Sequence, residues 1–218
     1  MRKAGWWNLG IAATALGDWQ EARRAWQACG MTPPEGDGPP NFGWGMTPVR
    51  LDPAGDGEVV WARRLDPARS QIESIPLPTS PFGWHDIVLV DGAPEGQRVV
   101  AGRAYPVFNV LARIASASVR KFIIELATVD DEAIHALATC ATERGGSAEN
   151  WGTATNILCD ECSRGVVHHH AEHDGTPAHP HCGLAARDRV HAEEIINAWL
   201  ASHPRADIIT WYEAPAYA

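Results

Sequence analysis

The feature that most constrains this chain is a concentration of metal-binding side chains between residues 159 and 183. This stretch holds three of the five cysteines and six of the ten histidines. Cys159 and Cys162 follow a β-prone segment, and Gly165 relieves the turn after them. His179 and Cys182 repeat the two-residue gap after sixteen intervening residues. The pattern C-x2-C-x16-H-x2-C is close to the spacing of four-ligand zinc sites, in which each pair directs two donors at one ion.

Thiolate and imidazole donors favour Zn2+ over hard cations. The pattern also resembles a zinc knuckle, and this resemblance implies a structural site closed by four protein ligands, whereas three ligands would leave a water for chemistry. The predicted ligands are Cys159, Cys162, His179 and Cys182, with His181 as the alternative to His179. Free or redox-active cysteines and another metal stay open as alternatives. The histidine tract of residues 168–173 is either a solvated loop or a weak second metal site.

Residues 4–30 carry apolar side chains at helical spacing and are predicted to form two helices. Gly17 can end the first helix, and Asp18 can cap the second. The spacing resembles one tetratricopeptide repeat over about residues 3–36, in which small residues let two antiparallel helices approach closely. The matching residues are Trp6, Leu9, Gly10, Ala22, Trp26 and Pro34.

A single helical pair of this kind cannot bury its own apolar face. It must therefore pack against the rest of the chain or against another protein, and the sequence leaves both alternatives open. Tryptophan often anchors protein interfaces. For the second alternative, the predicted partner-binding residues are Trp6, Trp7, Trp19 and Trp26.

Proline and glycine interrupt every regular pattern in residues 35–48, which we predict to be a linker. Residues 49–117 alternate short β-prone runs with turn residues, so we expect a small antiparallel sheet or partial barrel. Asp91-Gly92 is expected to open the loop of a hairpin, and a short helix is expected near residues 110–116. The neighbours His85 and Asp86 have the chemistry of an oriented base, although surface loop residues are the favoured interpretation.

Residues 118–218 are predicted to form an α+β unit fastened by the zinc loop. Strands are expected over residues 121–127, 151–158 and 208–212, and helices are expected from residue 131 to Gly145 and over residues 192–200. This order suits helices packed on one face of a sheet, a split βαβ arrangement. The fold class is therefore α+β, with a helical hairpin (1–34), a linker (35–48), a β-rich segment (49–117) and the zinc-stapled domain (118–218). The histidines expected to be exposed are His135, His191 and His203.

The formal net charge of −9 disfavours generic binding to nucleic acid or to anionic membranes. No apolar run approaches the roughly 20 residues that a bilayer span needs, so no membrane association is expected. The N-terminus lacks the apolar core of a signal peptide, and a cytoplasmic location is the default expectation.

The sequence contains no Gly-rich phosphate loop, G-x-S-x-G elbow, H-E-x-x-H helix or dinucleotide fingerprint. We therefore predict a non-enzymatic protein-binding or adaptor protein with a structural zinc site. The alternatives are a zinc-dependent hydrolase that uses the loop from Cys159 to Cys182, and a metal-sensing or metal-handling protein that uses the histidine tract.

Overall fold

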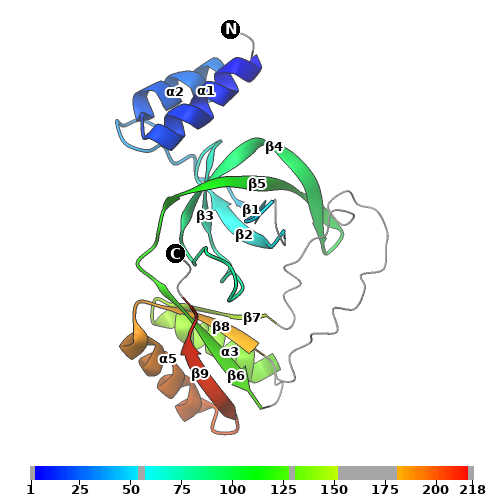
Figure 1. Ribbon diagram of the computed structural model, residues 1–218, viewed down its shortest axis with the longest axis vertical. Helices are drawn as coiled ribbons and strands as arrows, with labels where there is room; N and C mark the ends of the chain where they lie inside the picture. Colours follow the sequence, from blue (N-terminus) through cyan, green and yellow to red (C-terminus); the bar gives the residue numbers. More distant parts are fainter. Residues whose placement is uncertain (1–2, 54–56, 128–130, 152–180, 216–218) are drawn as a thin grey trace. The chain divides into compact units, whose positions relative to one another are not determined.

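The computed structural model describes residues 3–53, 57–127, 131–151 and 181–215. These residues form a mixed α+β structure (Figure 1). They group into two compact units. One unit contains the described residues of 1–73 and 85–116, and the other contains those of 74–84 and 117–215.

The first unit is built on a closed barrel in which the described strands follow one another as β1-β2-β3-β4-β5. Each strand pairs antiparallel with the next. An odd number of strands in such a meander brings the first and last together in the same direction, and β1 accordingly pairs with β5 in parallel. The strands are β1 (Met46–Arg50), β2 (Val59–Arg64), β3 (Arg69–Ile72), β4 (Ile87–Val100) and β5 (Arg103–Ala115).

Two elements of the barrel differ from the sequence-based expectation. Asp91-Gly92 lies inside β4, which pairs with β5 on both sides of these residues. The Trp7 indole packs directly on Gly92, and a Cβ at this position would overlap the ring. The hairpin turn is instead at Ala101-Gly102, where φ values of 49° and 76° fit a type I′ turn. The helix expected near residues 110–116 was also wrong, since this segment continues β5 and pairs with β4. Pairing within a barrel overrides the local helix propensity of such a segment.

The N-terminal segment forms two helices, α1 (Lys3–Leu16) and α2 (Trp19–Ala28). Gly17, with a φ of 71°, makes the turn between them. Asp18 caps α2, and its carboxylate accepts a hydrogen bond from the Glu21 amide at 3.0 Å. These two local predictions are confirmed.

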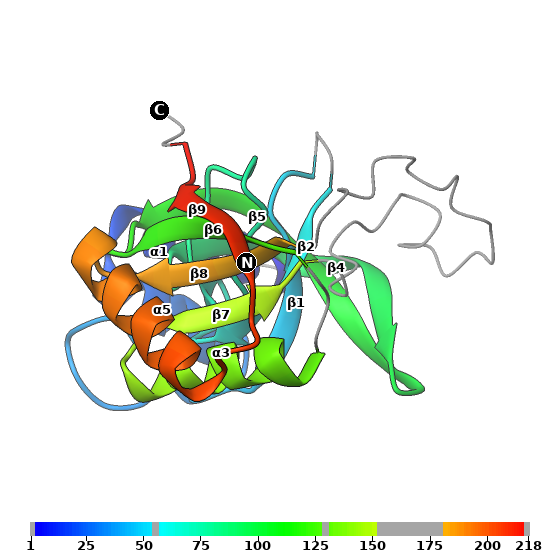
Figure 2. The ribbon, with the colours of Figure 1, turned by 90° about the horizontal axis from the view of Figure 1, so that it is seen from below.

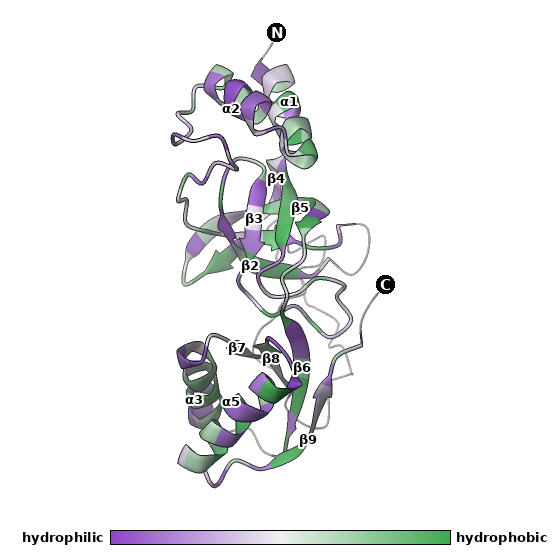
Figure 3. Cartoon of the chain, turned by 90° about the vertical axis from the view of Figure 1, so that its left-hand side faces the viewer, coloured by the Kyte–Doolittle hydropathy of each residue, from purple (hydrophilic) through white to green (hydrophobic). Residues whose placement is uncertain are grey.

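The helical pair packs on the barrel rather than standing alone. Figure 3 shows that α2 is mostly hydrophilic, and its buried residues are Ala22, Ala25 and Trp26. Trp26 belongs to a buried cluster that also contains Leu89 of β4 and Ala68. The rest of the chain therefore covers the apolar side of this hairpin, which was one of the two alternatives left open by the sequence.

The second unit is a sheet in the order β7-β8-β6-β9, and every neighbouring pair is antiparallel. The helices α3 and α5 lie together on one face of this sheet (Figure 2). The described elements follow one another as β6 (Arg120–Leu126), α3 (Asp131–Glu143), β7 (Ser147–Asn150), β8 (His181–Ala186), α5 (Arg189–Ser202) and β9 (Ile208–Glu213).

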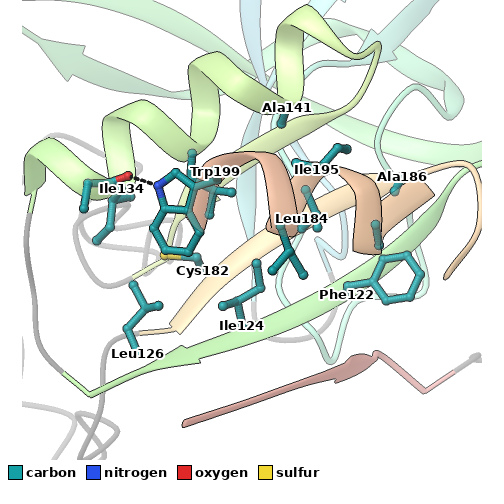
Figure 4. Close-up of a cluster of buried hydrophobic side chains, with 14 residues drawn as sticks. Phe122, Ile124, Leu126, Ile134, Ala141, Cys182, Leu184, Ala186, Ile195 and Trp199 are labelled. Carbon is teal, nitrogen blue, oxygen red and sulfur yellow. Dashed lines mark hydrogen bonds between the residues drawn. The ribbon is translucent and has the colours of Figure 1, made fainter. Parts of the chain in front are cut away.

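The core of this unit lies between the sheet and the two helices (Figure 4). Phe122 and Ile124 of β6 and Leu184 of β8 face Leu137 of α3, and all four are fully buried. Trp199 of α5 is also fully buried, and its Nε1–H donates to the Ala133 carbonyl at 2.8 Å. The helix expected over residues 192–200 is therefore confirmed.

Residues 74–84 belong to this second unit, although their sequence neighbours on both sides belong to the barrel unit. Ile75 lies on Gly183 of β8, and its amide donates to Glu149 Oε2 at 2.7 Å. The Ile75 carbonyl accepts a hydrogen bond from Trp151 Nε1 at 2.9 Å. Lys121 Nζ donates to the Leu77 carbonyl at 2.7 Å. This segment therefore covers part of the sheet face opposite the helices.

Among the described residues, none of the helices is long and apolar enough to cross a membrane.

Candidate functional site

Three of the four predicted zinc ligands, Cys159, Cys162 and His179, lie outside the described residues. The fourth, Cys182, lies in β8 with its side chain fully buried in the apolar core (Figure 4). Desolvation raises the pKa of the Cys182 thiol to about 12, so the group stays protonated at neutral pH. The Cys182 thiol therefore lies in the apolar core rather than in a loop, and its role as a zinc ligand stays a prediction.

His181, the alternative ligand, lies on the other face of β8, because successive side chains of a strand point to opposite faces. Its Nε2 is 3.6 Å from Glu125 Oε1. The same oxygen accepts a hydrogen bond from the Tyr212 hydroxyl at 3.2 Å. Desolvation and the bond to Glu125 raise the pKa of Tyr212. Within residues 3–53, 57–127, 131–151 and 181–215, no group of three or more His, Cys, Asp or Glu side chains could hold a metal ion.

The tryptophans of the helical hairpin do not form one exposed surface. Trp26 is fully buried, and Trp7 packs against it edge to face with ring centroids 5.5 Å apart. Trp7 also lies on Gly92 of β4. The Trp26 side chain therefore packs inward in this structure, and partner binding by Trp26 stays a prediction.

Trp6 and Trp19 are half-buried, and each ring lies beside a guanidinium group. Arg24 Cζ is 4.8 Å from the Trp6 ring centroid, and Arg69 Cζ is 4.9 Å from that of Trp19. Arg69 is buried, and its Nε is 2.6 Å from Oδ2 of the buried Asp66. Trp19 therefore packs on a buried ion pair at the barrel. For Trp6, Trp7 and Trp19, partner binding stays a prediction.

His85 and Asp86 do not form an acid–base pair with each other. The Asp86 carboxylate is buried and lies 3.5 Å from Arg113 Nη1. His85 Nε2 lies 3.6 Å from Glu73 Oε2 instead, and Glu73 Oε1 is 2.8 Å from Arg63 Nε. His85 and Asp86 thus have different ionic partners. This arrangement does not support the hypothesis that Asp86 orients His85 as a general base.

The barrel presents a different cluster, which we call the arginine–aromatic platform. It consists of Trp61 of β2, Arg98 of β4, and Arg103 and Tyr105 of β5. The Trp61 and Tyr105 rings meet edge to face, with centroids 5.0 Å apart and planes at 87°. Arg98 Cζ is 5.5 Å from the Trp61 ring centroid, and Arg103 Cζ is 5.0 Å from the Tyr105 ring centroid. Each cation is thus within the range in which a ring face attracts it.

The tight turn at Ala101-Gly102 places these residues on one face. It fixes the register of the hairpin so that Val100 lies opposite Arg103 and Arg98 lies opposite Tyr105. Opposite residues of an antiparallel pair share a face of the sheet. Arg98 is held further by a bond from its Nη1 to the Val59 carbonyl at 3.3 Å. Arg103 is exposed, and the other three platform residues are half-buried, so the cluster is pre-formed and reaches solvent.

The comparisons with known proteins give no functional relative. No family model matches the chain, and no curated protein matches it. A solved structure of a hypothetical protein from Neisseria gonorrhoeae aligns with 10% sequence identity over 80% of this chain and 96% of that chain, at a TM-score of 0.33. A TM-score of this size does not establish a shared fold.

Two assignments made from the sequence are therefore corrected. The tetratricopeptide assignment was wrong, because no family model supports a repeat and the helical pair uses its apolar side to pack on the barrel. The zinc-knuckle assignment and the metal-binding description were also wrong, because no family model matches and the described residues contain no metal-binding group. The individual ligand roles of Cys159, Cys162, His179 and Cys182 stay predictions.

Sequence reasoning missed the arginine–aromatic platform because it placed the hairpin loop at the wrong residues. Asp-Gly is among the strongest short hairpin signals. The turn was therefore expected at Asp91-Gly92 and not at Ala101-Gly102. With the turn at Ala101-Gly102, the alternation of Arg98 and Val100 and of Arg103 and Tyr105 would have placed these side chains on one face. No local signal indicates that Trp61 joins them, since β2 pairs with β1 and β3 rather than with this hairpin.

Proposed function

We propose that this chain is a non-enzymatic, cytoplasmic protein-binding protein, and that the arginine–aromatic platform of its barrel is the binding surface. The observation that carries the proposal is the pre-formed contact of two guanidinium groups with two aromatic rings, on strands that a tight turn holds in register. Arg, Trp and Tyr are the residue types most enriched at the energetic centres of protein interfaces.

The chemistry of the platform also indicates what kind of segment would bind there. Guanidinium groups recognise carboxylates through paired hydrogen bonds, and exposed ring faces and edges accept other aromatic or aliphatic side chains. The matching partner segment therefore carries Asp or Glu next to an aromatic residue. The guanidinium groups of Arg98 and Arg103 are cations within a chain whose net charge is −9, and their charge can orient such a segment.

A nucleic acid would use the same side chains differently, since bases stack on aromatic rings and phosphates bind arginine. Two arginines neutralise few phosphates, and the net charge of −9 repels the rest of a polyanion. These two facts favour a protein partner.

The test is a selection of displayed peptides on the immobilised full chain, followed by affinity measurements with the selected peptides. We expect acidic–aromatic sequences, and we expect Arg98→Gln and Trp61→Ala each to weaken binding by at least about tenfold, as at an interface hot spot. Arg24→Gln is the matched control, because it removes a similar arginine–tryptophan contact on the helical hairpin.

Three outcomes would contradict the proposal. The first is a selection that yields no binding peptide. The second is peptide binding that Arg98→Gln and Arg24→Gln reduce equally. The third is tight binding of a single-stranded oligonucleotide that only the platform variants abolish, which would assign the surface to nucleic acid instead.

A further inference from the structure

The sheet of the second unit ends at β9, and the outer edge of this strand has the properties of a pairing surface. Among the described strands, β9 pairs with β6 alone and lies at one margin of the sheet (Figure 2). Its sequence, Ile-Ile-Thr-Trp-Tyr-Glu, is β-branched and aromatic except for the last residue. It contains neither Pro nor Lys, which commonly protect exposed edges. Ile209 is 48% exposed and Tyr212 is 41% exposed.

The hydrogen bonds to β6 show which backbone groups face outward. The Ala214 amide donates to the Lys121 carbonyl at 2.8 Å, which makes these two residues a hydrogen-bonded pair. Such pairs alternate with non-bonded pairs along an antiparallel ladder. The N–H and C=O groups of Glu213 and Trp211 therefore point away from β6, toward the edge at which none of the described strands pairs.

A second copy of the same strand matches this edge. In a two-fold antiparallel pairing centred on Trp211, the outward groups of Trp211 would bond to those of the copy. Thr210 would lie opposite Tyr212 of the copy, a β-branched–aromatic pair of the kind that stabilises sheets. Glu213 would lie opposite Ile209 of the copy, so no like charges meet there. Glu213 Oε1 is 3.0 Å from Arg120 Nη1 of its own chain, which partly neutralises its charge.

We infer that the chain forms a homodimer by antiparallel pairing of β9 with β9 of a second copy, which joins the two four-stranded sheets into one. Two identical strands related by a two-fold axis can satisfy each other's outward backbone N–H and C=O groups, so no partner of different sequence is needed. Two-fold dimers are also the commonest homo-oligomers. This surface is separate from the arginine–aromatic platform of the barrel, and the dimer does not depend on the proposed peptide binding.

The test compares the mass of the full chain in solution for the wild type, Glu213→Pro and Glu213→Ala, at about 1 to 100 µM. Both substitutions remove the ion pair with Arg120, but only proline removes the outward N–H that the copy would use. We expect twice the 23.6-kDa chain mass for the wild type and Glu213→Ala. For Glu213→Pro we expect a dissociation constant raised by about 10- to 100-fold, because symmetry removes two hydrogen bonds at once.

A monomeric wild type throughout this range would overturn the inference, even if the edge accepts an unrelated extended peptide. So would a dimer that Glu213→Pro leaves intact, or one that both substitutions weaken equally. If hydrogen exchange shows that Glu213→Pro disturbs β6, Thr210→Lys serves as the second variant. It places a lysine opposite Glu125 within the chain and adds two positive charges at the predicted interface. Dimerisation unaffected by Thr210→Lys would also refute the inference.

Discussion

The contact between Gly10 and Trp26 allows a sharp test of how the helical hairpin packs. A Cβ built on Gly10 would lie 2.5 Å from Cζ3 and 2.8 Å from Cε3 of the Trp26 indole. Ordinary contacts between carbon atoms are about 3.5–4.0 Å. Gly10→Ala therefore forces the fully buried ring to retreat by roughly 1 Å, against neighbours on the barrel.

Two effects of Gly10→Ala oppose each other, and their sizes decide the sign. Replacing glycine by alanine inside a helix stabilises it by up to about 1 kcal/mol. Overpacking a tightly filled site costs about 1–3 kcal/mol. With the full propensity gain, we therefore expect Gly10→Ala to lower the free energy of unfolding of the first unit by about 0–2 kcal/mol. In a Trp26→Phe background the clash is absent, and the same substitution should be neutral or stabilising by up to about 1 kcal/mol.

Hydrogen exchange measured by mass spectrometry can resolve this effect, because peptides from α1 and α2 report on the hairpin while peptides from β6 and β8 serve as an internal reference. Ala12→Gly, at an exposed position of α1, measures the helix propensity term alone. The reasoning is refuted if Gly10→Ala slows exchange in the wild-type background, or if its cost is the same in the presence and absence of the Trp26 indole.

Two further predictions concern buried ionisable groups. The raised pKa of Cys182, about 12 in the folded chain against about 8.5 when unfolded, means that the unfolded state loses its proton first as pH rises. Relative to Cys182→Ala, the wild type should therefore lose about 1.6 kcal/mol of stability between pH 8.5 and pH 10 in urea unfolding, and parallel pH profiles would contradict this. Asp66→Ala leaves the Arg69 charge buried without its carboxylate, and should cost about 3–5 kcal/mol in thermal or chemical unfolding. Arg120→Ala, which breaks an exposed ion pair, should cost less than about 1 kcal/mol, and equal losses in the two variants would refute the assignment.

The sequence predicted the features that depend on neighbours along the chain. The cap at Asp18, the turn at Gly17 and the helix over residues 192–200 all depend on local sequence, and each is present in the structure. The close approach of Gly10 and Trp26 is also present, although the tetratricopeptide resemblance that implied it was wrong. Such features need no knowledge of the tertiary fold, and the α+β class could be predicted from their order.

The errors occurred where distant residues decide the outcome. Cys182 was expected to lie in a loop because of its spacing from His179, but the strand begins at His181, and the alternation along β8 turns the thiol into the core. His191 was expected to be exposed, yet it is buried, with Nδ1 accepting from the Arg187 amide and Nε2 2.9 Å from the Arg144 carbonyl. Two backbone partners compensate for burying this ring, and no sequence pattern reveals them.

The assignment of residues 74–84 to the second unit has a practical consequence for the design of truncated fragments of this protein. A fragment that stops near residue 117 would keep this segment but lose the sheet that it covers. A fragment that starts there would keep the sheet but lose the Ile75 groups that satisfy Glu149 and Trp151. Because neither piece is complete, we expect the halves to express poorly alone and to recover when produced together in one cell.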